Sequence, residues 1–358
     1  MFDFTPLTAK QKKQKKTLLS RRVKQVALKK TTTVVNLVES MADMSIQARN
    51  IGQCAAVLKN IYLDQERPTV FLGLAGPLIA AGLRKVIRDL VVNRAVDVVV
   101  STGAIIYQDI YAAFGYGHFY GSQYADDPAL RDIRVDRIYD TYIDEEKVWQ
   151  TDRFCGQVAD RMAPGAYSSR QYIEHLADQI DDSESIVYQC RKNNIPIFVP
   201  ALNDSSIGIG LTEHRVRVEK EKRPGVMIDA IRDNMEIVQI VVKSPKTAAF
   251  YVAGGVPKNY INDSIVMGYI YGLDRGHDYA LQITTAVTAD GGLSSSTLSE
   301  ARSWGKVKKR ANFAMAWVEP SVSLPLLTGY IFGKELTKGR KRLHYQWENS
   351  SLKSLTTV

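Results

Sequence analysis

The stretch Thr69-Val70-Phe71-Leu72-Gly73-Leu74-Ala75-Gly76 decides the fold of this 358-residue chain. It is a short apolar run that ends in small residues, and a helical pattern follows it. We predict six strands of this kind, at residues 69–72, 96–100, 195–199, 248–252, 279–283 and 313–318. Nearly continuous hydrophobicity is typical of parallel strands that helices cover on both faces. The pattern predicts an α/β fold with a doubly wound, mostly parallel, Rossmann-like sheet and helices on both faces.

Ahead of the first strand, residues 34–62 space their apolar side chains as amphipathic helices do, which predicts an N-terminal helical extension. We therefore divide the chain into a basic arm at 1–33, helices at 34–64, an α/β domain at 65–337 and a C-terminal tail at 338–358. Residues 119–190 are rich in charge and tyrosine. We expect them to form an insertion or lid within the α/β domain.

The positive charge is confined to the arm. Residues 1–30 carry eight lysines, Arg21 and Arg22 against the single acid Asp3, so they account for the whole net charge of +9. Such arms bind nucleic acid or acidic partners nonspecifically, but most lysine runs are solvated and mobile. We expect no specific nucleic-acid partner, and we interpret the second basic cluster, at 338–342, as solvated too.

Several classes of protein are disfavoured. Cys54, Cys155 and Cys190 are scattered and have no ligand spacing, so neither a disulfide framework nor a metal site is predicted. The sequence shows no secretory h-region and no apolar run of about 18 residues, so we expect a cytoplasmic protein without membrane spans. It has neither a GxGxxG motif after the first strand nor a P-loop, which argues against ordinary Rossmann dehydrogenases and P-loop NTPases.

Small or polar residues follow every predicted strand, at 73–76, 101–104, 201–206, 253–255, 284–286 and 319–321. In open parallel sheets, ligands bind outside the carboxyl ends of the strands. Small residues there let a cofactor approach the backbone, and helix N-termini favour phosphate groups. These six loops are therefore expected to build one ligand site.

The segment Glu300-Ala301-Arg302-Ser303-Trp304-Gly305-Lys306 carries the clearest chemistry. A neutral lysine amine forms imines, and burial against Trp304 would favour the neutral form. Glu300 is suited to hold a substrate ammonium, and the indole offers a flat wall to a polymethylene chain. Without context, the alternative is a surface lysine whose stem covers an aromatic face.

Seven motifs, in one order, supply that context. They are Phe71-Leu72-Gly73, Val99-Val100-Ser101-Thr102-Gly103, Asn193-Asn194-Ile195-Pro196 through Pro200-Ala201-Leu202, Gly254-Gly255-Val256-Pro257-Lys258, Thr285-Ala286, Ser303-Trp304-Gly305-Lys306 and Leu324-Pro325-Leu326-Leu327. Over roughly residues 65–335, the chain resembles the deoxyhypusine synthase family.

The resemblance implies an NAD-dependent transferase of alkyl groups. Enzymes of that family oxidise spermidine, form an imine with an active-site lysine, and pass the aminobutyl group to a lysine of the hypusine-containing translation factor. Lys306 occupies the position of that catalytic lysine. The resemblance also implies a homotetramer whose sites lie between subunits, with the N-terminal region near a neighbour's site.

Position matching assigns the remaining site residues. The positions implied for NAD are Gly76, Pro77, Leu78, Ile79, Ala80, Thr102, Gly103, Ala104, Asp204, Gly254, Thr285, Ala286, Glu319 and Pro320. The substrate positions are Glu300, Ser303, Trp304, Asn259, Tyr107 and Gln108. We add His118 as a replacement acid or base, although a lone histidine is more often structural.

This chain departs from the family pattern where acids bind the substrate. Tyr107 and Gln108 replace paired glutamates, Ile209 and Leu293 replace aspartates, and Asn259 replaces a histidine. A buried ammonium needs a charged partner, so these changes disfavour spermidine. The pattern is similar to the prokaryotic deoxyhypusine synthase-like proteins, and we expect a small amine of polyamine metabolism as substrate. Two alternatives stay open: a deoxyhypusine synthase that modifies a protein lysine, and a non-catalytic regulatory paralogue.

Overall fold

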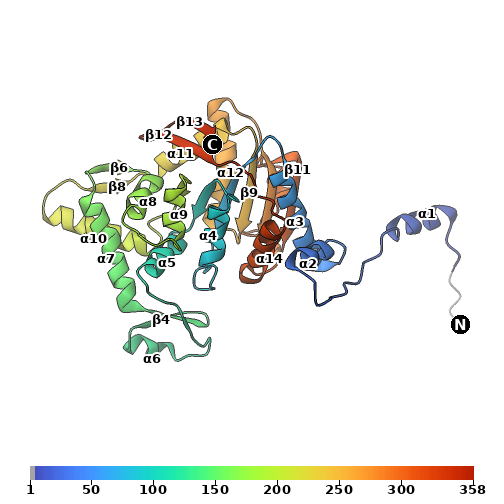
Figure 1. Ribbon diagram of the computed structural model, residues 1–358, viewed down its shortest axis with the longest axis horizontal. Helices are drawn as coiled ribbons and strands as arrows, with labels where there is room; N and C mark the ends of the chain where they lie inside the picture. The colour runs from blue at the N-terminus through green and yellow to red at the C-terminus, as the bar shows by residue number, and fades with distance from the viewer. Residues whose placement is uncertain (1–4) are drawn as a thin grey trace.

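The computed structural model describes residues 5–358, so residues 1–4 of the expected arm lie outside the described residues. A six-stranded parallel sheet, in the order β11-β10-β9-β1-β2-β7, forms the centre of the molecule (Figure 1). Its strands are β1 (Thr69–Leu74), β2 (Val98–Ser101), β7 (Ile197–Phe198), β9 (Thr247–Val252), β10 (His277–Ile283) and β11 (Val307–Ala316). Each overlaps one predicted strand, which confirms the predicted fold class.

The strand order creates a switch point beside β1. The chain builds outward from β1 through β2 to β7, and then returns to β9 on the other side of β1. Leu74, the last residue of β1, is level with Ser101 of β2 and Val252 of β9. The connections after β1 and β9 therefore diverge at one edge of the sheet, where ligands bind in doubly wound folds.

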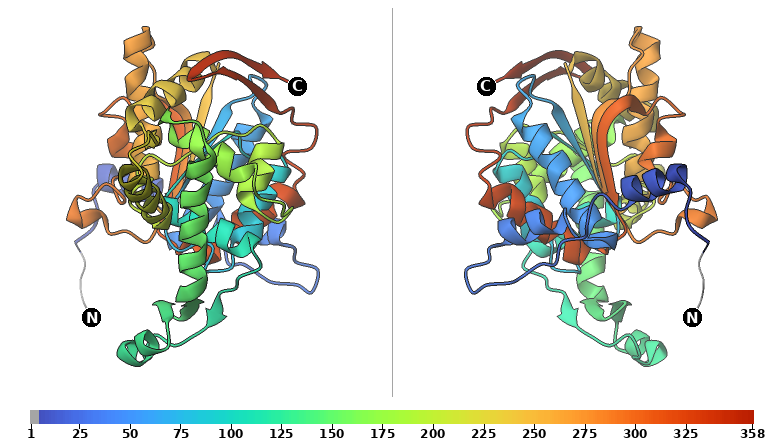
Figure 2. Two further views of the ribbon diagram at one scale, coloured as in Figure 1. Left: turned by 90° about the vertical axis from the view of Figure 1, so that its left-hand side faces the viewer. Right: turned by 90° about the vertical axis from the view of Figure 1, so that its right-hand side faces the viewer.

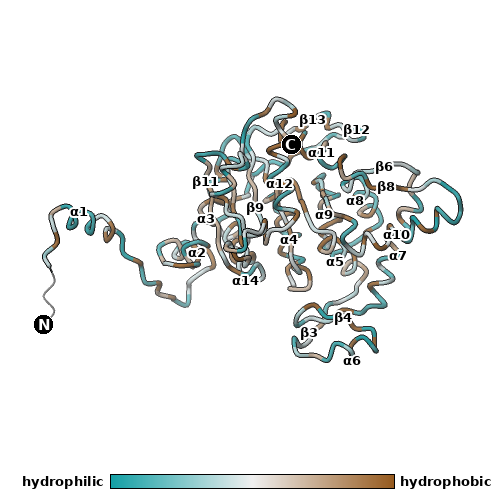
Figure 3. Tube along the Cα trace, turned by 180° about the vertical axis from the view of Figure 1, so that it is seen from behind, coloured by the Kyte–Doolittle hydropathy of each residue, from teal (hydrophilic) through white to brown (hydrophobic). Residues whose placement is uncertain are grey.

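Helices cover both faces of the sheet (Figure 2). One face packs against α3 (Ile46–Leu63), α4 (Arg84–Val92), α5 (Gly103–Ala113), α8 (Ser169–Ala177), α9 (Ile186–Lys192) and α14 (Pro320–Gly333). The other face packs against α11 (Ala230–Lys243), α12 (Gly255–Val266), the 3-10 helix η1 (Met267–Tyr271) and α13 (Leu298–Ala301). A second 3-10 helix, η2 (Thr288–Asp290), lies in the loop before α13. The buried strands are thus enclosed between two layers of helices, whereas the N-terminal helix at residues 9–18 is largely hydrophilic (Figure 3, teal).

Residues 119–190 connect β2 to β7. Their first part is a small sheet of β3 (Phe119–Tyr120), β5 (Thr141–Asp144) and β4 (Val135–Ile138) with α6 (Asp127–Asp132), and it protrudes from the body (Figure 1). The long helix α7 (Glu145–Arg161) returns to the body and packs against α10 (Ser206–Lys220). The short strand β6 (Gly165–Tyr167) pairs with β8 (Val226–Ile228). A lid function for this insertion stays a prediction.

The N-terminal helical extension consists of α2 (Val34–Met41) and α3, and Val38 of α2 is fully buried. Ahead of it, α1 (Ala9–Leu18) stands away from the body and exposes all its side chains (Figure 1). Arg21 and Lys24 both pair with Asp43, at 2.7 and 2.5 Å. These contacts attach the basic segment to the helical extension.

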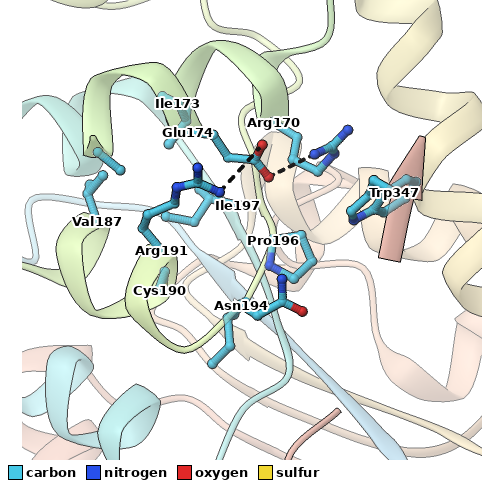
Figure 4. A pocket seen from close by; sticks show the side chains of 12 residues that line it. Arg170, Ile173, Glu174, Val187, Cys190, Arg191, Asn194, Pro196, Ile197 and Trp347 are labelled. Carbon is cyan, nitrogen blue, oxygen red and sulfur yellow. Dashed lines mark hydrogen bonds and ion pairs between the residues drawn. The ribbon is translucent and has the colours of Figure 1, made fainter. Parts of the chain in front are cut away.

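The C-terminal residues form a hairpin of β12 (Leu343–Glu348) and β13 (Ser351–Thr357) that packs on the body. Trp347 stacks on the guanidinium of Arg170, 4.3 Å from the ring centroid, and Figure 4 shows both beside a small pocket. Arg340 is only 6% exposed and pairs with Asp97 at 2.6 Å. The interpretation of residues 338–342 as a solvated cluster is therefore wrong for Arg340.

The three cysteines are free and buried. Among residues 5–358, no group of histidine, cysteine, aspartate and glutamate side chains is placed to hold a metal ion. No helix in that range is long and apolar enough to cross a membrane.

Candidate functional site

Lys306 lies in a tight turn between α13 and β11. Its backbone N–H donates to Ala301 O at 3.0 Å, and its carbonyl accepts from His277 N–H at 3.0 Å. Gly305 precedes it with φ +71°, a left-handed conformation that favours glycine. These bonds hold the Lys306 backbone between the end of α13 and the start of β10.

The Lys306 amine contacts two side chains on α12. Its Nζ lies 3.2 Å from Asn259 Oδ1 and 3.1 Å from Asp263 Oδ1. Asn259 Nδ2 in turn donates to Asp263 Oδ2 at 2.9 Å. Asn259 and Asp263 are four residues apart, so they share one face of the helix. The amine is therefore held by a three-residue network, of which the sequence predicted only Lys306 and Asn259.

Trp304 lies beside the amine, as expected, but leaves it open to solvent on one side. Lys306 Nζ is 5.7 Å from the indole centroid, a cation-π distance. The Trp304 side chain itself is 68% exposed. Burial of Lys306 against Trp304 is thus incomplete within a single chain.

Glu300 and Ser303 lie on the same turn of chain as Trp304. Both are exposed, and Ser303 Oγ donates to the Glu300 carbonyl at 2.8 Å. The Glu300 backbone N–H donates to Thr297 Oγ1, which caps α13. The Glu300 carboxylate is therefore available to a ligand.

Lys258 is a site residue that the sequence analysis quoted only as part of a motif. It is 1% exposed, and its Nζ donates to Ser296 O at 2.5 Å and Leu293 O at 3.2 Å. Burial lowers the pKa of Lys258 to about 8; the Glu300 charge opposes this shift and the Lys306 charge adds to it. Lys258 thus links the loop before α13 to α12 by hydrogen bonds, and the charges of Glu300 and Lys306 both affect its pKa. The available signal in the sequence was its place in the motif Gly254-Gly255-Val256-Pro257-Lys258, directly before Asn259.

The positions expected to hold a dinucleotide all follow strands of the central sheet. Residues 76–80 follow β1, 102–104 follow β2, Asp204 follows β7, Gly254 follows β9, 285–286 follow β10 and 319–320 follow β11. Because the strands are parallel, the fold brings all of them to one edge of the sheet.

Two of these positions bear directly on whether a dinucleotide fits. Gly76 has φ +88°, is exposed, and has no described heavy atom closer than 4.0 Å to an added Cβ, so its backbone is open to a ligand. Gly254 begins α12, and an added Cβ there would lie 2.6 Å from Ser294 Cα. This glycine is needed for close packing of the loop before α13 against the α12 N-terminus. Of these two positions, Gly76 has the open backbone that a dinucleotide phosphate would need, whereas Gly254 is covered by the protein itself.

Tyr107, Gln108 and His118 do not join Lys306 within one chain. Tyr107 is buried on α5, across the sheet from α12, and its hydroxyl donates to Val148 O at 2.7 Å. Gln108 is half-buried on the same helix. His118 packs on Tyr111, with ring centroids 5.7 Å apart, and burial lowers its pKa. A shared site with Lys306 would need a second chain.

Asp109, the one acid beside Tyr107 and Gln108, is structural. It is fully buried, with Oδ1 2.6 Å from Arg84 Nε, and its Oδ2 accepts from Ser185 Oγ and Val187 N–H at 2.7 and 2.9 Å. Its carboxylate therefore anchors α9 and does not face a ligand.

Comparison with known proteins is consistent with this arrangement. The family model for deoxyhypusine synthase matches residues 36–331. Deoxyhypusine synthase-like proteins of Chlorobaculum parvum and Chlorobaculum tepidum are each 42% identical, over 93% and 91% of this chain and 95% and 94% of their own lengths. A crystal structure of a provisionally assigned deoxyhypusine synthase from Entamoeba histolytica matches with a TM-score of 0.59 at 20% identity, covering 87% of this chain and 97% of that one. That structural match supports the fold, and the sequence matches show that the chain belongs to the deoxyhypusine synthase family.

Proposed function

We propose that this protein is an NAD-dependent aminoalkyl transferase in which Lys306 forms an imine with the transferred group. The observation that carries the proposal is the position of the Lys306 amine, 3.1 Å from Asp263 and 3.2 Å from Asn259. Asn259 lies five residues after Gly254, or about 7 Å along the axis of α12. Lys306 precedes β11 and its carbonyl bonds to the start of β10, so the amine contacts the middle of α12, and its place beside the nicotinamide is part of the proposal.

The dinucleotide would lie along the switch-point edge. The backbone at Gly76 would admit the pyrophosphate, Thr102 to Ala104 would place the N-terminus of α5 toward it, and Asp204 would accept ribose hydroxyls. The N-terminus of α12 at Gly254, by contrast, is already covered by Ser294. Glu319 is less free, since its Oε2 accepts from Ser321 N–H at 2.7 Å. NAD, when bound, supplies two-electron oxidation of the donor amine and the matching reduction of the product imine.

Lys306 links the two halves of this reaction. The neutral Nζ attacks the imine carbon of the oxidised donor, and the donor nitrogen leaves as an amine, which takes up the proton lost by Nζ. An acceptor amine then attacks the same carbon and releases Lys306. Asn259 orients the amine by accepting a hydrogen bond from Nζ, and Glu300 and Trp304 would receive the cation and the methylene chain of the acceptor amine.

A small amine is the acceptor that this site favours. The carboxylates that the family places at positions 107, 108, 209 and 293 are absent, and Tyr107 is committed to Val148. A polyamine with several ammonium groups would have few charged partners here. Modification of a hypusine-type translation factor is the other outcome that an assay must distinguish.

We also propose that the active form is a homotetramer with sites between subunits. Around Lys306, apolar side chains are exposed on several elements, with Trp304 at 68%, Tyr269 at 69% and Ile270 at 62%. Large apolar side chains that are exposed on neighbouring segments are typical of interaction sites. A neighbouring chain would cover Trp304 and complete the burial of the Lys306 amine.

Borohydride trapping tests the assignment of Lys306. After incubation with NAD and putrescine, reduction should add the mass of an aminobutyl group to the peptide that contains Lys306, and Lys306→Ala should abolish this adduct. Lys309→Ala is the matched control, because Lys309 is an exposed lysine on the same segment. An adduct that survives in Lys306→Ala would refute the assignment.

The acceptor is identified from the same reaction by mass spectrometry of products. A new small polyamine establishes a metabolic transferase, whereas a modified translation factor establishes protein modification. Measurable NAD binding without any product would contradict both and favour a regulatory protein.

A further inference from the structure

We propose that Asp263 is a specificity-determining residue that binds the distal cation of an α,ω-diamine donor once Lys306 is neutral. This inference rests on the proposed function, because it concerns the donor of the same reaction. It concerns Asp263, which is not among the positions that the family resemblance assigns.

Asp263 lines an open groove beside Lys306. The residues that line the groove are apolar or aromatic, Val256, Tyr260, Val266, Met267 and Leu293, together with the polar residues Asn234, Asn259 and Asp263. Among the described residues that line it, Asp263 is the one carboxylate. An apolar wall with a single negative charge fits a methylene chain that ends in one cation.

The Asp263 carboxylate contacts other side chains of the protein and is also accessible from the groove. Its side chain is 45% exposed, whereas that of Lys306 is 16% exposed. Both carboxylate oxygens are engaged, Oδ1 by the Lys306 amine and Oδ2 by Asn259 Nδ2. While Lys306 is an ammonium, it is the cation that neutralises Asp263.

The reaction removes the positive charge of Lys306 from beside Asp263. Lys306 must give up a proton before Nζ can attack, and that proton passes to the imine nitrogen of the oxidised donor or to solvent. The carboxylate is then left beside a neutral lysine, where an unpaired charge is unfavourable. A substrate ammonium or guanidinium in the groove restores the pairing, so diamines are favoured over monoamines of equal chain length.

Asp263 can neutralise only one substrate cation, so the groove also disfavours donors that carry more than one distal cation. A triamine such as spermidine carries a further ammonium, and the described residues that line the groove include no second carboxylate, only the neutral polar side chains of Asn234, Asn259 and Tyr260. Burying that charge without a partner is costly. The expected order of affinity is therefore putrescine or agmatine first, spermidine next and butylamine last.

Titration of amines into the full-length protein in the presence of NAD tests this inference. In Lys306→Met protein that is otherwise wild type, Asp263 has no internal cation and no turnover occurs, so putrescine should bind at least ten-fold more tightly than butylamine. Adding Asp263→Asn should reduce this ratio to about one. The amide keeps the shape of the side chain and its contact with Asn259, so the fold should be maintained. Adding Asp274→Asn instead, at an exposed aspartate after η1, should keep the ratio of Lys306→Met.

The ratio of affinities separates selectivity from a structural role. A merely structural effect of Asp263→Asn would weaken both amines equally and leave the ratio at its Lys306→Met value, which would overturn the inference. A wild-type preference for spermidine over putrescine would overturn it too. Because binding is measured directly, these results stand whether or not borohydride traps an adduct on Lys306, so failure of the inference and failure of the proposed function are distinguishable.

Discussion

His277 shows how one buried side chain makes stability depend on pH. It is fully buried at the start of β10, Nδ1 lies 3.0 Å from Thr247 Oγ1, and burial lowers its pKa from 6.5 to about 3. Below pH 6.5, His277 binds a proton in the unfolded chain but not in the folded chain. The free energy of unfolding therefore decreases as the pH falls from 6.5 toward 3. At pH 4.5 we expect this residue alone to cost about 2 to 3 kcal/mol of unfolding free energy.

Urea unfolding at pH 7.0 and pH 4.5 checks this prediction. His277→Gln should lose about 2 kcal/mol less than wild type between the two pH values. The exposed His344 provides the control, because His344→Gln should follow the wild-type pH dependence. Equal losses in His277→Gln and wild type would show that another group controls acid stability.

At the scale of elements, the C-terminal hairpin is attached to the sheet by a buried ion cluster. Arg340 and Arg67 both pair with Asp97, which is 3% exposed just before β2. Removing one partner of a buried charge is strongly destabilising, and here Arg67 would remain to compensate in part. We expect Arg340→Ala to lower the free energy of unfolding by about 2 to 4 kcal/mol.

Lys338→Ala is the matched control for Arg340→Ala. Lys338 lies on the same basic segment, and its pair with Glu335 is exposed on both sides. Its loss should change stability by less than about 0.5 kcal/mol, as for most exposed pairs. Similar effects of the two variants in chemical denaturation would mean that the segment behaves as a solvated cluster after all.

At the scale of the whole molecule, the exposed apolar side chains near Lys306 predict assembly. Light scattering during gel filtration should give about four times the chain mass of 40.0 kDa. A charge at the centre of an apolar interface is unfavourable, so Ile270→Asp should produce smaller species. Ile133→Asp, at an exposed site in the protruding insertion, is the control and should leave the mass unchanged. A wild-type monomer would contradict the proposed tetramer.

The sequence alone was sufficient for the central fold. Strands buried on both faces must be nearly continuous in hydrophobicity, and this requirement made all six strands of the sheet visible, from β1 to β11. The family could be identified for a related reason, since the motif around Lys306 and the strand-end loops are local features of the chain. Chemistry that depends only on residue type and on short spacing along the chain can be predicted from the sequence without a structure.

The tertiary structure decided which side chains share a site. Asn259 lies 47 residues from Lys306, and hydrophobic periodicity carries no information on the strand order that brings them together. Asp263 and Lys258 became site residues for the same reason, because α12 packs beside the loop before β11. Tyr107 and Arg340 are the converse cases. The sequence predicted that Tyr107 binds a ligand, but its hydroxyl donates to Val148 O. It predicted that Arg340 is solvated, but Arg340 pairs with the buried Asp97. Local sequence determines what an element is, and only the packing of elements determines which polar groups meet.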